Sequence, residues 1–292
     1  MAAGLDDARA RHLVADYFGA ASRLRQLRAA PGFGAPIFVV DFDRGARHYR
    51  TFGSFGPTFG TAHPEELQVT EQSSMDLLYP AQLVFHYERL MSLAFALVER
   101  PVTALLLGVG GAAMWRFVRA YLPDCAPILV DAEESVAAVA RRWFYLSQPV
   151  VIETAERFLA GNTQQFDVVL VDLYNARGPA VLDEAFWARA VDALTPGGCL
   201  AANWADFATN KGVRPITEAL TATARARALD TYFVTRRGFR DNLIQYLPTG
   251  GERLPEAITA ALERFAGARN LPDRGRFILE HCLISTGFPI GM

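Results

Sequence analysis

Cysteine is scarce in this 292-residue sequence, and lysine is nearly absent. The three cysteines, Cys125, Cys199 and Cys282, lie far apart and form neither a CxxC pair nor a cysteine–histidine cluster with zinc spacing. We therefore expect no disulfide framework and no metal site. Disulfides are rare in a reducing cytoplasm, which is the compartment that this cysteine usage favours.

Long hydrophobic runs and a strong net charge are also missing. The longest apolar run, from Ala104 to Trp115, is interrupted by glycines and too short to span a bilayer, and the N-terminal segment lacks the apolar core of a signal peptide. The net charge of -2 argues against the nucleic-acid backbone as a partner. With 51% hydrophobic residues the chain can bury a core, so we expect a soluble, cytoplasmic protein without nucleic-acid or membrane partners.

Apolar periodicity predicts a helix and then a small sheet in the N-terminal part. Over the first thirty residues, apolar side chains recur at spacings of four and three, which is typical of one face of a helix. They are Leu13, Tyr17, Ala20, Leu24 and Leu27. We expect this face to pack on its own domain, with an oligomer contact as the alternative. Short β-type runs between residues 37 and 72, with a glycine-rich loop from Gly53 to Gly60, predict an antiparallel sheet.

The rest of the chain alternates between strand and helix patterns. A helix is expected from Ala81 to Glu99, and from Thr103 onward short apolar runs alternate with amphipathic segments. This alternation is typical of a parallel, doubly wound sheet. Two further runs, joined around residues 236–242, predict an antiparallel hairpin at the sheet edge. We expect a helix plus β-domain at residues 1–80 and the doubly wound domain at residues 81–292.

A glycine turn and an aspartate together predict a nucleoside site. Gly108, Val109, Gly110 and Gly111 follow the first parallel strand, where glycines let the backbone approach a ligand and expose helix N-terminal amides. A tight strand-to-helix turn is the alternative interpretation of these glycines. Asp131 ends the next strand, in a position to accept hydrogen bonds from ribose hydroxyls. NAD stays possible, whereas the missing GK[ST] ending excludes a P-loop.

Two further strand ends carry polar side chains. Asp172 follows four apolar residues, and a carboxylate there is costly unless it is solvated or paired, so we expect it to face the same crevice as Asp131. Asn203 and Trp204 follow the last parallel strand. We expect these two to form hydrogen bonds and to pack beneath a loop, with a ligand contact as the alternative.

Six segments, taken together and in order, resemble the spermidine synthase family and, more closely, its divergent bacterial spermidine-synthase-like branch. They are QSSMDL, FHYERLM, LLLGVGG, ILVDAEESVAAVARRWF, VVLVDLYNARGPA and ALTPGG. The glycine turn and the PGG turn are shared with most class I methyltransferases, whereas the segment that begins at Asp172 is much more specific to aminopropyltransferases. The resemblance implies an α/β fold: a class I methyltransferase-like, Rossmann-like doubly wound sheet with a small N-terminal β-domain and an N-terminal helix.

The resemblance also implies an activity, namely transfer of an aminopropyl group from decarboxylated S-adenosylmethionine to an amine such as putrescine, in polyamine biosynthesis. Asp172 matches the aspartate that binds and deprotonates the amine, and Tyr87 or the adjacent His86 falls near that amine. Gln72 and Asn175 fall on the substrate side. The positions that match the cofactor side are Gly108, Val109, Gly110, Gly111, Asp131, Ala132, Thr154 and Ala155. A homodimer without a metal is expected.

The chain departs from the family at three acidic positions. Aspartates of the family are replaced here by Gly111 in the glycine loop, by Thr154 after the third strand and by Asn175 after the fourth. Each lost carboxylate removes a charge-assisted hydrogen bond, roughly 1.5–3 kcal/mol, which weakens the case for putrescine. Two alternatives therefore stay open: a methyltransferase that uses S-adenosylmethionine, and a non-catalytic nucleoside-binding relative. A basic or amide-rich contact beside Gly110 would favour the methyltransferase.

Overall fold

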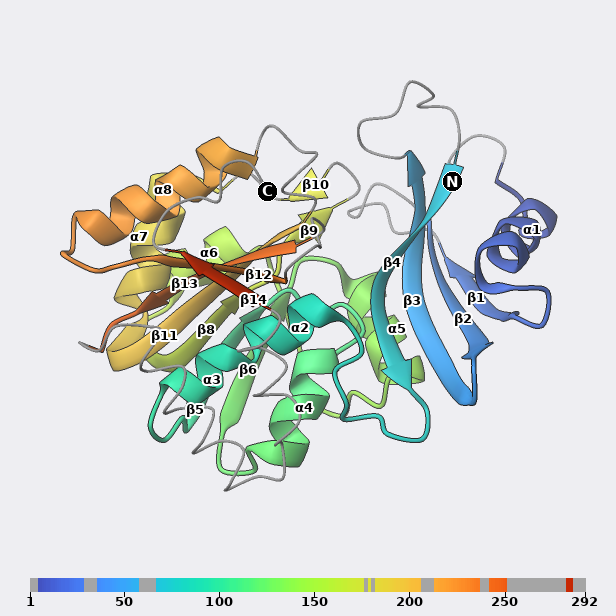
Figure 1. Ribbon diagram of the computed structural model, residues 1–292, viewed down its shortest axis with the longest axis horizontal. Helices are drawn as coiled ribbons and strands as arrows, with labels where there is room; N and C mark the ends of the chain where they lie inside the picture. The colour runs from blue at the N-terminus through green and yellow to red at the C-terminus, as the bar shows by residue number, and fades with distance from the viewer. Residues whose placement is uncertain are drawn as a thin grey trace.

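The computed structural model of the protein describes residues 5–28, 36–57, 67–175, 178–179, 182–205, 213–236, 242–250 and 282–285. Its N-terminal part is a helix packed on a four-stranded antiparallel sheet of order β1-β2-β3-β4, drawn in blue and cyan in Figure 1. These elements are α1 (Asp7–Phe18), β1 (Arg23–Arg28), β2 (Ile37–Arg44), β3 (Arg47–Pro57) and β4 (Leu67–Asp76).

The N-terminal helix is shorter than the sequence predicted. Helix α1 ends at Gly19, whose φ of 97° lies in the region that favours glycine, and the chain then enters strand β1. Leu24 and Leu27 misled the prediction because an irregularity in the β1–β2 pairing between Leu24 and Gln26 lets these two leucines, three residues apart, pack in the same cluster. The helix packs on its own sheet, as expected.

The small sheet lies between two helices. One face packs against α1, through an aromatic and aliphatic cluster that includes Phe38, Phe42 and Phe55. The other face packs against α5 (Glu134–Trp143) of the larger part, mainly through Phe52 and Met75. The expected glycine-rich loop begins late, because β3 continues to Pro57, and residues 58–60 lie outside the described residues.

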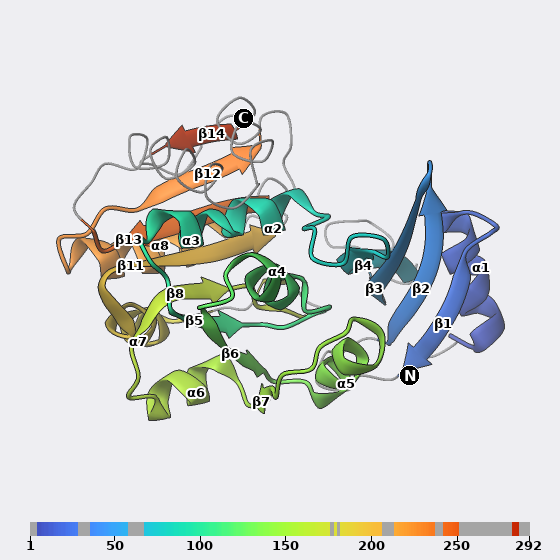
Figure 2. The same ribbon diagram turned by 90° about the horizontal axis from the view of Figure 1, so that it is seen from below.

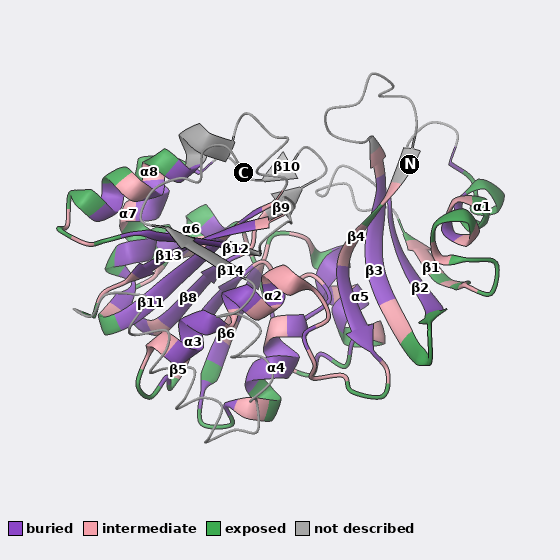
Figure 3. Ribbon diagram, viewed as in Figure 1, coloured by how far each residue is buried: buried purple, intermediate pink, exposed green. Residues whose placement is uncertain are grey.

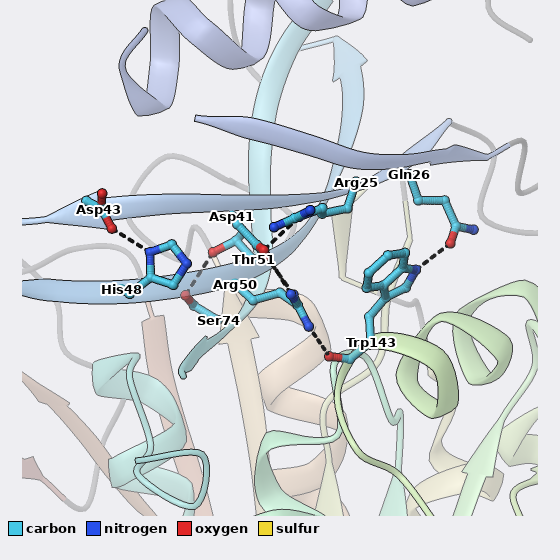
Figure 4. A network of polar contacts seen from close by, with 9 residues as sticks. All are labelled: Arg25, Gln26, Asp41, Asp43, His48, Arg50, Thr51, Ser74 and Trp143. Atoms are coloured by element: carbon cyan, nitrogen blue, oxygen red, sulfur yellow. Dashed lines mark hydrogen bonds and ion pairs between the residues drawn. The ribbon is translucent and has the colours of Figure 1, made fainter. Parts of the chain in front are cut away.

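A buried ion-pair network fastens this sheet to α5 (Figure 4). Asp41 is 2% exposed and accepts hydrogen bonds from Arg25 Nε (2.7 Å) and from Arg50 Nε and Nη2 (2.6 and 2.8 Å). Arg50 also donates to the Trp143 carbonyl (3.2 Å), and the Trp143 indole donates to Gln26 (2.6 Å). The network therefore holds the position of the small sheet relative to the rest of the molecule.

We expect Asp41→Asn to lower the free energy of unfolding by about 2 kcal/mol, because two guanidinium groups lose their buried counter-charge while Arg25 keeps partial access to water. Burial alone would raise the pKa of Asp41, but the bonds from Arg50 and Arg25 outweigh it and lower that pKa. The ion pair thus contributes above about pH 4. In urea unfolding, the difference between variant and wild type should shrink as the pH falls below that value; a constant difference would contradict this account.

The larger part is built on an eight-stranded sheet in the described residues, of order β14-β12-β13-β11-β8-β5-β6-β7 (Figures 1 and 2). Its strands are β5 (Thr103–Leu107), β6 (Ala126–Asp131), β7 (Val151–Ile152), β8 (Phe166–Val171), β11 (Leu194–Ala205), β12 (Tyr232–Arg236), β13 (Asn242–Pro248) and β14 (Cys282–Ser285). Five neighbouring strands, β11, β8, β5, β6 and β7, pair in parallel. The other three, β12, β13 and β14, pair antiparallel. The predicted α/β class is confirmed.

Helices cover both faces of this sheet, as a doubly wound sheet requires. The remaining helices are α2 (His86–Met91), α3 (Leu93–Leu97), α4 (Ala113–Tyr121), α6 (Ala155–Gly161), α7 (Glu184–Asp192) and α8 (Val213–Arg225); β9 (Tyr174–Asn175) and β10 (Gly178–Pro179) form a separate two-stranded sheet. One core joins α2, α3, α4 and α5 to one face, and the other joins α6, α7 and α8 to the opposite face. The central strands are accordingly buried along most of their length (Figure 3).

Three details of the prediction for this part are wrong. The helix expected from Ala81 to Glu99 is two short helices. Phe85 has an extended backbone, so the first helix begins only at His86, and Ser92 separates it from the second. The third parallel strand is only two residues long. The predicted hairpin, β12 and β13, forms, but β14 pairs outside β12, so the hairpin is not the edge. The proposed division into domains at residue 80 stays a prediction.

Candidate active site

A cleft of about 640 Å³ lies at the carboxyl ends of β5, β6, β8 and β11, beneath α2 and the edge of β4. The chain order of the parallel strands reverses between β5 and β8, and ligands of open α/β sheets bind at such a point. Eleven of the predicted site residues line the cleft: Gln72, Tyr87, Gly108, Val109, Gly110, Gly111, Asp131, Ala132, Thr154, Ala155 and Asp172. His86 is not among the lining residues, and the side chain of Asn175 lies outside the described residues.

The glycine turn follows β5 and lies in the middle of this cleft, with Asp131 after β6 at one end and Asp172 after β8 at the other. Gly108 has a φ of 92°, and a Cβ at this position would overlap the carbonyl oxygen of Asp172. Gly110 also has a positive φ, 48°, but the space around it is open. Strand β5 can therefore lie directly beside the end of β8 only because residue 108 has no side chain.

Asp131 holds the glycine turn in place. Its Oδ2 accepts the backbone N–H of Val109 (2.9 Å), and its Oδ1 accepts that of Glu133 (2.9 Å). Burial raises the pKa of Asp131 in spite of these bonds. Each carboxylate oxygen can accept a second hydrogen bond, so the side chain can bind a ribose hydroxyl while it orders the turn. The sequence predicted the ligand contact but not this structural role.

Asp172 lies at the other end of the cleft and is partly enclosed by asparagines. Asn203 Nδ2 donates to Asp172 Oδ1 (2.8 Å), and Asn242 Nδ2 donates to Asn203 Oδ1 (3.0 Å). Burial raises the pKa of Asp172, and the bond from Asn203 opposes that rise. Trp204, by contrast, is buried and donates to Gln245, as its structural interpretation predicted. The hydrogen-bonding role expected of Asn203 is therefore found at the cleft itself, whereas Asn242 was missed because no sequence spacing connects it with the site.

Tyr87 faces Asp172 from helix α2. Its hydroxyl donates to the backbone carbonyl of Gln72 (3.1 Å), and burial, followed by the charges of Asp172 and Glu88, raises its pKa well above the ordinary value. Tyr87 is therefore a neutral hydrogen-bond donor at neutral pH. The side-chain amide of Gln72 donates toward Ser54 (3.4 Å), so this residue holds Tyr87 through its backbone.

Glu88 is a cleft residue that the sequence interpretation missed. It lines the cleft while only 3% exposed, and its Oε2 accepts the Phe85 N–H (3.0 Å) at the start of α2. Burial raises its pKa to about 7, and the charge of Asp172 adds to that rise, whereas Phe85 and Arg116 oppose it. A glutamate at this helix position is typical of capping, and only burial turns it into a titratable group of the site.

We expect Glu88→Gln to stabilise the protein at pH 8 by roughly 1–3 kcal/mol, because glutamine keeps the cap and cannot carry the buried charge. The native state holds this proton up to about pH 7, whereas the unfolded chain releases it near its ordinary value of 4.5. Stability of the wild type should therefore fall from about pH 4.5 to 7 relative to the variant. Parallel pH–stability curves for the two proteins would contradict this assignment.

Gly111 has no room for the aspartate that the resembling family carries there. A Cβ at this position would lie 2.7 Å from Ser73 Oγ and 2.8 Å from Ser73 Cβ. Arg116 donates to the Gly111 carbonyl and to the Phe144 carbonyl (3.1 Å), and burial lowers its pKa to about 10. Arg116 is the basic group nearest to the turn, but it is not among the residues that line the cleft, so it does not favour a methyltransferase.

Metal ligands, cysteines and apolar helices are the other features of the described chain that bear on its chemistry. No three His, Cys, Asp or Glu side chains among the described residues are grouped so as to hold a metal ion. Cys125 and Cys199 are buried and form no disulfide within the described residues, and burial raises the pKa of the Cys199 thiol. No helix in the described ranges is long and apolar enough to cross a membrane.

Comparison with known proteins gives matches in sequence and in fold, although no family model matches the chain. A polyamine aminopropyltransferase of Chromobacterium violaceum is 34% identical over 145 residues, which are 46% of this chain and 54% of the relative. A polyamine aminopropyltransferase of Neisseria meningitidis serogroup B is 28% identical over 169 residues, 55% of this chain and 64% of the relative. The chain thus matches less than two thirds of each relative's length.

Solved structures share the fold at low identity. A probable spermidine synthase of Corynebacterium glutamicum aligns with a TM-score of 0.56 and 17% identity, covering 78% of this chain and 86% of that one. The spermidine synthase of Thermotoga maritima gives 0.53 and 15%, covering 83% and 86%. Human methyltransferase-like protein 13, solved with SAH, gives 0.52 and 23%, covering 66% and 93%. The predicted resemblance to spermidine synthases is confirmed, and so is the methyltransferase-like fold.

Proposed function

We propose that this protein transfers an aminopropyl group from decarboxylated S-adenosylmethionine to a small amine, with release of methylthioadenosine. One observation carries the proposal: a single cleft has Asp131 at one end, the half-buried carboxyl group of Asp172 and the buried one of Glu88 at the other, and the glycine turn held by Asp131 between them. The first end suits a nucleoside and the second a cationic amine. The named sequence relatives are aminopropyltransferases, which supports this reading.

The chemistry requires little beyond positioning and a base. The amine nitrogen forms a bond to the propyl carbon beside the sulfonium, the carbon–sulfur bond breaks, and its electron pair stays on sulfur. The proton of the attacking amine passes to the Asp172 carboxylate, whose raised pKa makes it a stronger base than an exposed aspartate. Tyr87 stays neutral at the same end, with its hydroxyl proton donated to the Gln72 carbonyl, and Glu88 attracts the ammonium form of the acceptor before reaction.

The donor end is supported by the same contacts. Asp131 orders the amides of the turn, and a neighbour of the same fold, human methyltransferase-like protein 13, was solved with SAH, which supports a nucleoside ligand. Thr154 and Ala155, at the start of α6, line the same end of the cleft. We assign the adenosine to this end, so that the sulfonium lies between Asp131 and Asp172. Assembly as a homodimer and a location in the cytoplasm stay predictions.

The deciding experiment is a turnover assay of the wild-type protein with each donor and a panel of monoamines and diamines, with separation of the nucleoside products. Methylthioadenosine formed from the decarboxylated donor only when amine is present supports the proposal. Release of S-adenosylhomocysteine from S-adenosylmethionine would replace it by the methyltransferase alternative. No nucleoside product with any pair would leave the non-catalytic alternative.

Calorimetry with methylthioadenosine tests the donor end separately. We expect Asp131→Ala to weaken binding by about 1.5–3 kcal/mol, since a charge-assisted hydrogen bond to the ribose is lost. Because Asp131 also bonds to the turn, its variant should melt at a lower temperature as well. Glu153→Gln, at another acidic residue that lines this end, provides the matched control. Equal affinities of the wild type and Asp131→Ala would exclude the ribose assignment.

A further inference from the structure

We propose that Asn203 and Asn242 form a positioning relay that orients Asp172 and keeps its carboxylate ionised for proton transfer. The inference rests on the proposed function, in which Asp172 accepts the proton of the amine. It assigns a role to Asn203, which the sequence placed at a strand end, and to Asn242, which no motif connects with the site. Both asparagines line the cleft together with Asp172.

The relay runs across neighbouring strands of the large sheet. Asp172 follows β8, Asn203 lies near the end of β11, and Asn242 begins β13, and β11 pairs with both of the other strands. The two hydrogen bonds are 3.0 Å from Asn242 Nδ2 to Asn203 Oδ1 and 2.8 Å from Asn203 Nδ2 to Asp172 Oδ1. The carboxyl edge of the sheet thus brings the three side chains into one line.

The two bonds support one orientation of Asn203. A side-chain amide has one oxygen that accepts and one nitrogen that donates, whereas an ionised carboxylate can only accept. Asp172 therefore takes the nitrogen of Asn203, and the oxygen of Asn203 accepts the bond from Asn242. A flipped Asn203 would place its oxygen against the carboxylate and would lose the bond to Asp172, and the bond from Asn242 favours the unflipped form. Asn242 therefore acts on Asp172 without touching it, and Oδ2 of Asp172 is left for the amine.

Within the described residues, burial raises the pKa of Asp172, whereas the bond from Asn203 lowers it. The titratable groups that face it are Tyr87 and Glu88 of α2; an ionised Glu88 repels the Asp172 charge. The glycine turn and strands β11 and β13 bring no charged side chain to it in the part of the chain described here. Loss of the relay should therefore favour the protonated, inactive form.

The test is direct titration of the Asp172 carboxyl by carbon-13 NMR in the full-length protein, with the signal assigned by its loss in Asp172→Asn. The variants are Asn203→Ala, which removes the donor, and Asn242→Ala, which removes only the group that orients it. Asn162→Ala, at the C-terminal end of α6 on a half-buried asparagine that does not line the cleft, is the control. Neither cleft substitution introduces a charge.

We expect a graded result. The titration midpoint of Asp172 should move to higher pH in Asn203→Ala, by a smaller amount in Asn242→Ala, and not at all in Asn162→Ala. Turnover at pH 7 should fall by between about ten- and a hundredfold in Asn203→Ala and should recover as the pH rises, as expected for a lost bond to a charged group. A merely structural pair would lower turnover at all pH values alike.

The outcomes separate the relay from the proposed function. Unchanged midpoints in both cleft variants would overturn the relay, whatever happens to turnover. A shift in Asn203→Ala alone would overturn the role of Asn242. If the midpoints move in the expected order while the wild type shows no methylthioadenosine release, the positioning of Asp172 stands and the proposed function fails.

Discussion

Asp172→Asn is expected to lower the rate of aminopropyl transfer by about 10²–10⁴-fold, the usual cost of losing a general base. Asparagine keeps the shape of the side chain, and its oxygen can still accept the bond from Asn203. It cannot take a proton from the attacking amine, and it has no charge with which to hold the ammonium form. The measurement is the single-turnover rate of methylthioadenosine formation at saturating donor.

Binding separates this loss from a structural defect. Methylthioadenosine affinity should barely change in Asp172→Asn, because the nucleoside contacts lie at the other end of the cleft, around Asp131. Asp124→Asn, at an exposed aspartate on the loop before β6, should match the wild type in both assays. A variant at Asp172 that turns over within threefold of the wild type, a margin of roughly 0.7 kcal/mol in the barrier, would remove this residue from the mechanism.

Gly108→Ala is expected to cost about 3 kcal/mol or more of folding stability and to abolish nucleoside binding. Its Cβ would occupy the space of the Asp172 carbonyl oxygen, and its φ of 92° is unfavourable for any residue with a side chain. Relief requires the ends of β5 and β8 to move apart. That movement would displace both the turn amides and Asp172. Chemical unfolding and calorimetry with methylthioadenosine measure the two effects.

Gly110→Ala makes the matched comparison, two residues further along the same turn. Its φ of 48° is also positive, but no atom lies within 4 Å of the position that a Cβ would take. We expect only the conformational cost, about 1–2 kcal/mol, and retained binding. Similar losses in the two variants would show that the positive φ, and not the contact with Asp172, accounts for the requirement at Gly108.

Local patterns predicted much of the larger part because its strands are buried on both faces. Continuous apolar runs such as residues 104–107 and 168–171 can hardly lie elsewhere than inside a covered parallel sheet. The residues that end these runs then fall at one edge of the sheet. For this reason the sequence alone predicts that the glycine turn, Asp131 and Asp172 share a crevice, and all of them line the cleft.

The N-terminal part shows where such patterns fail. Leu24 and Leu27 have helical spacing, yet they belong to a strand, since a local irregularity in pairing changes the period of two that strands normally show. Nothing in the sequence marks that irregularity. The partner strand β2 determines it, through pairing that reaches across the chain.

By itself, the sequence determined the class of fold, the common edge at which the parallel strands end and the two aspartates that line the cleft there, because these follow from local hydrophobic periodicity and from residue type. Only the tertiary structure decided the rest of the site. Glu88 becomes titratable near neutral pH through burial, and Gly111 is kept without a side chain by Ser73 from another sheet. Asn203 and Asn242 meet because β11 and β13 pair. Burial and contacts between distant segments exist only after the chain has folded, so no spacing along the sequence encodes them directly.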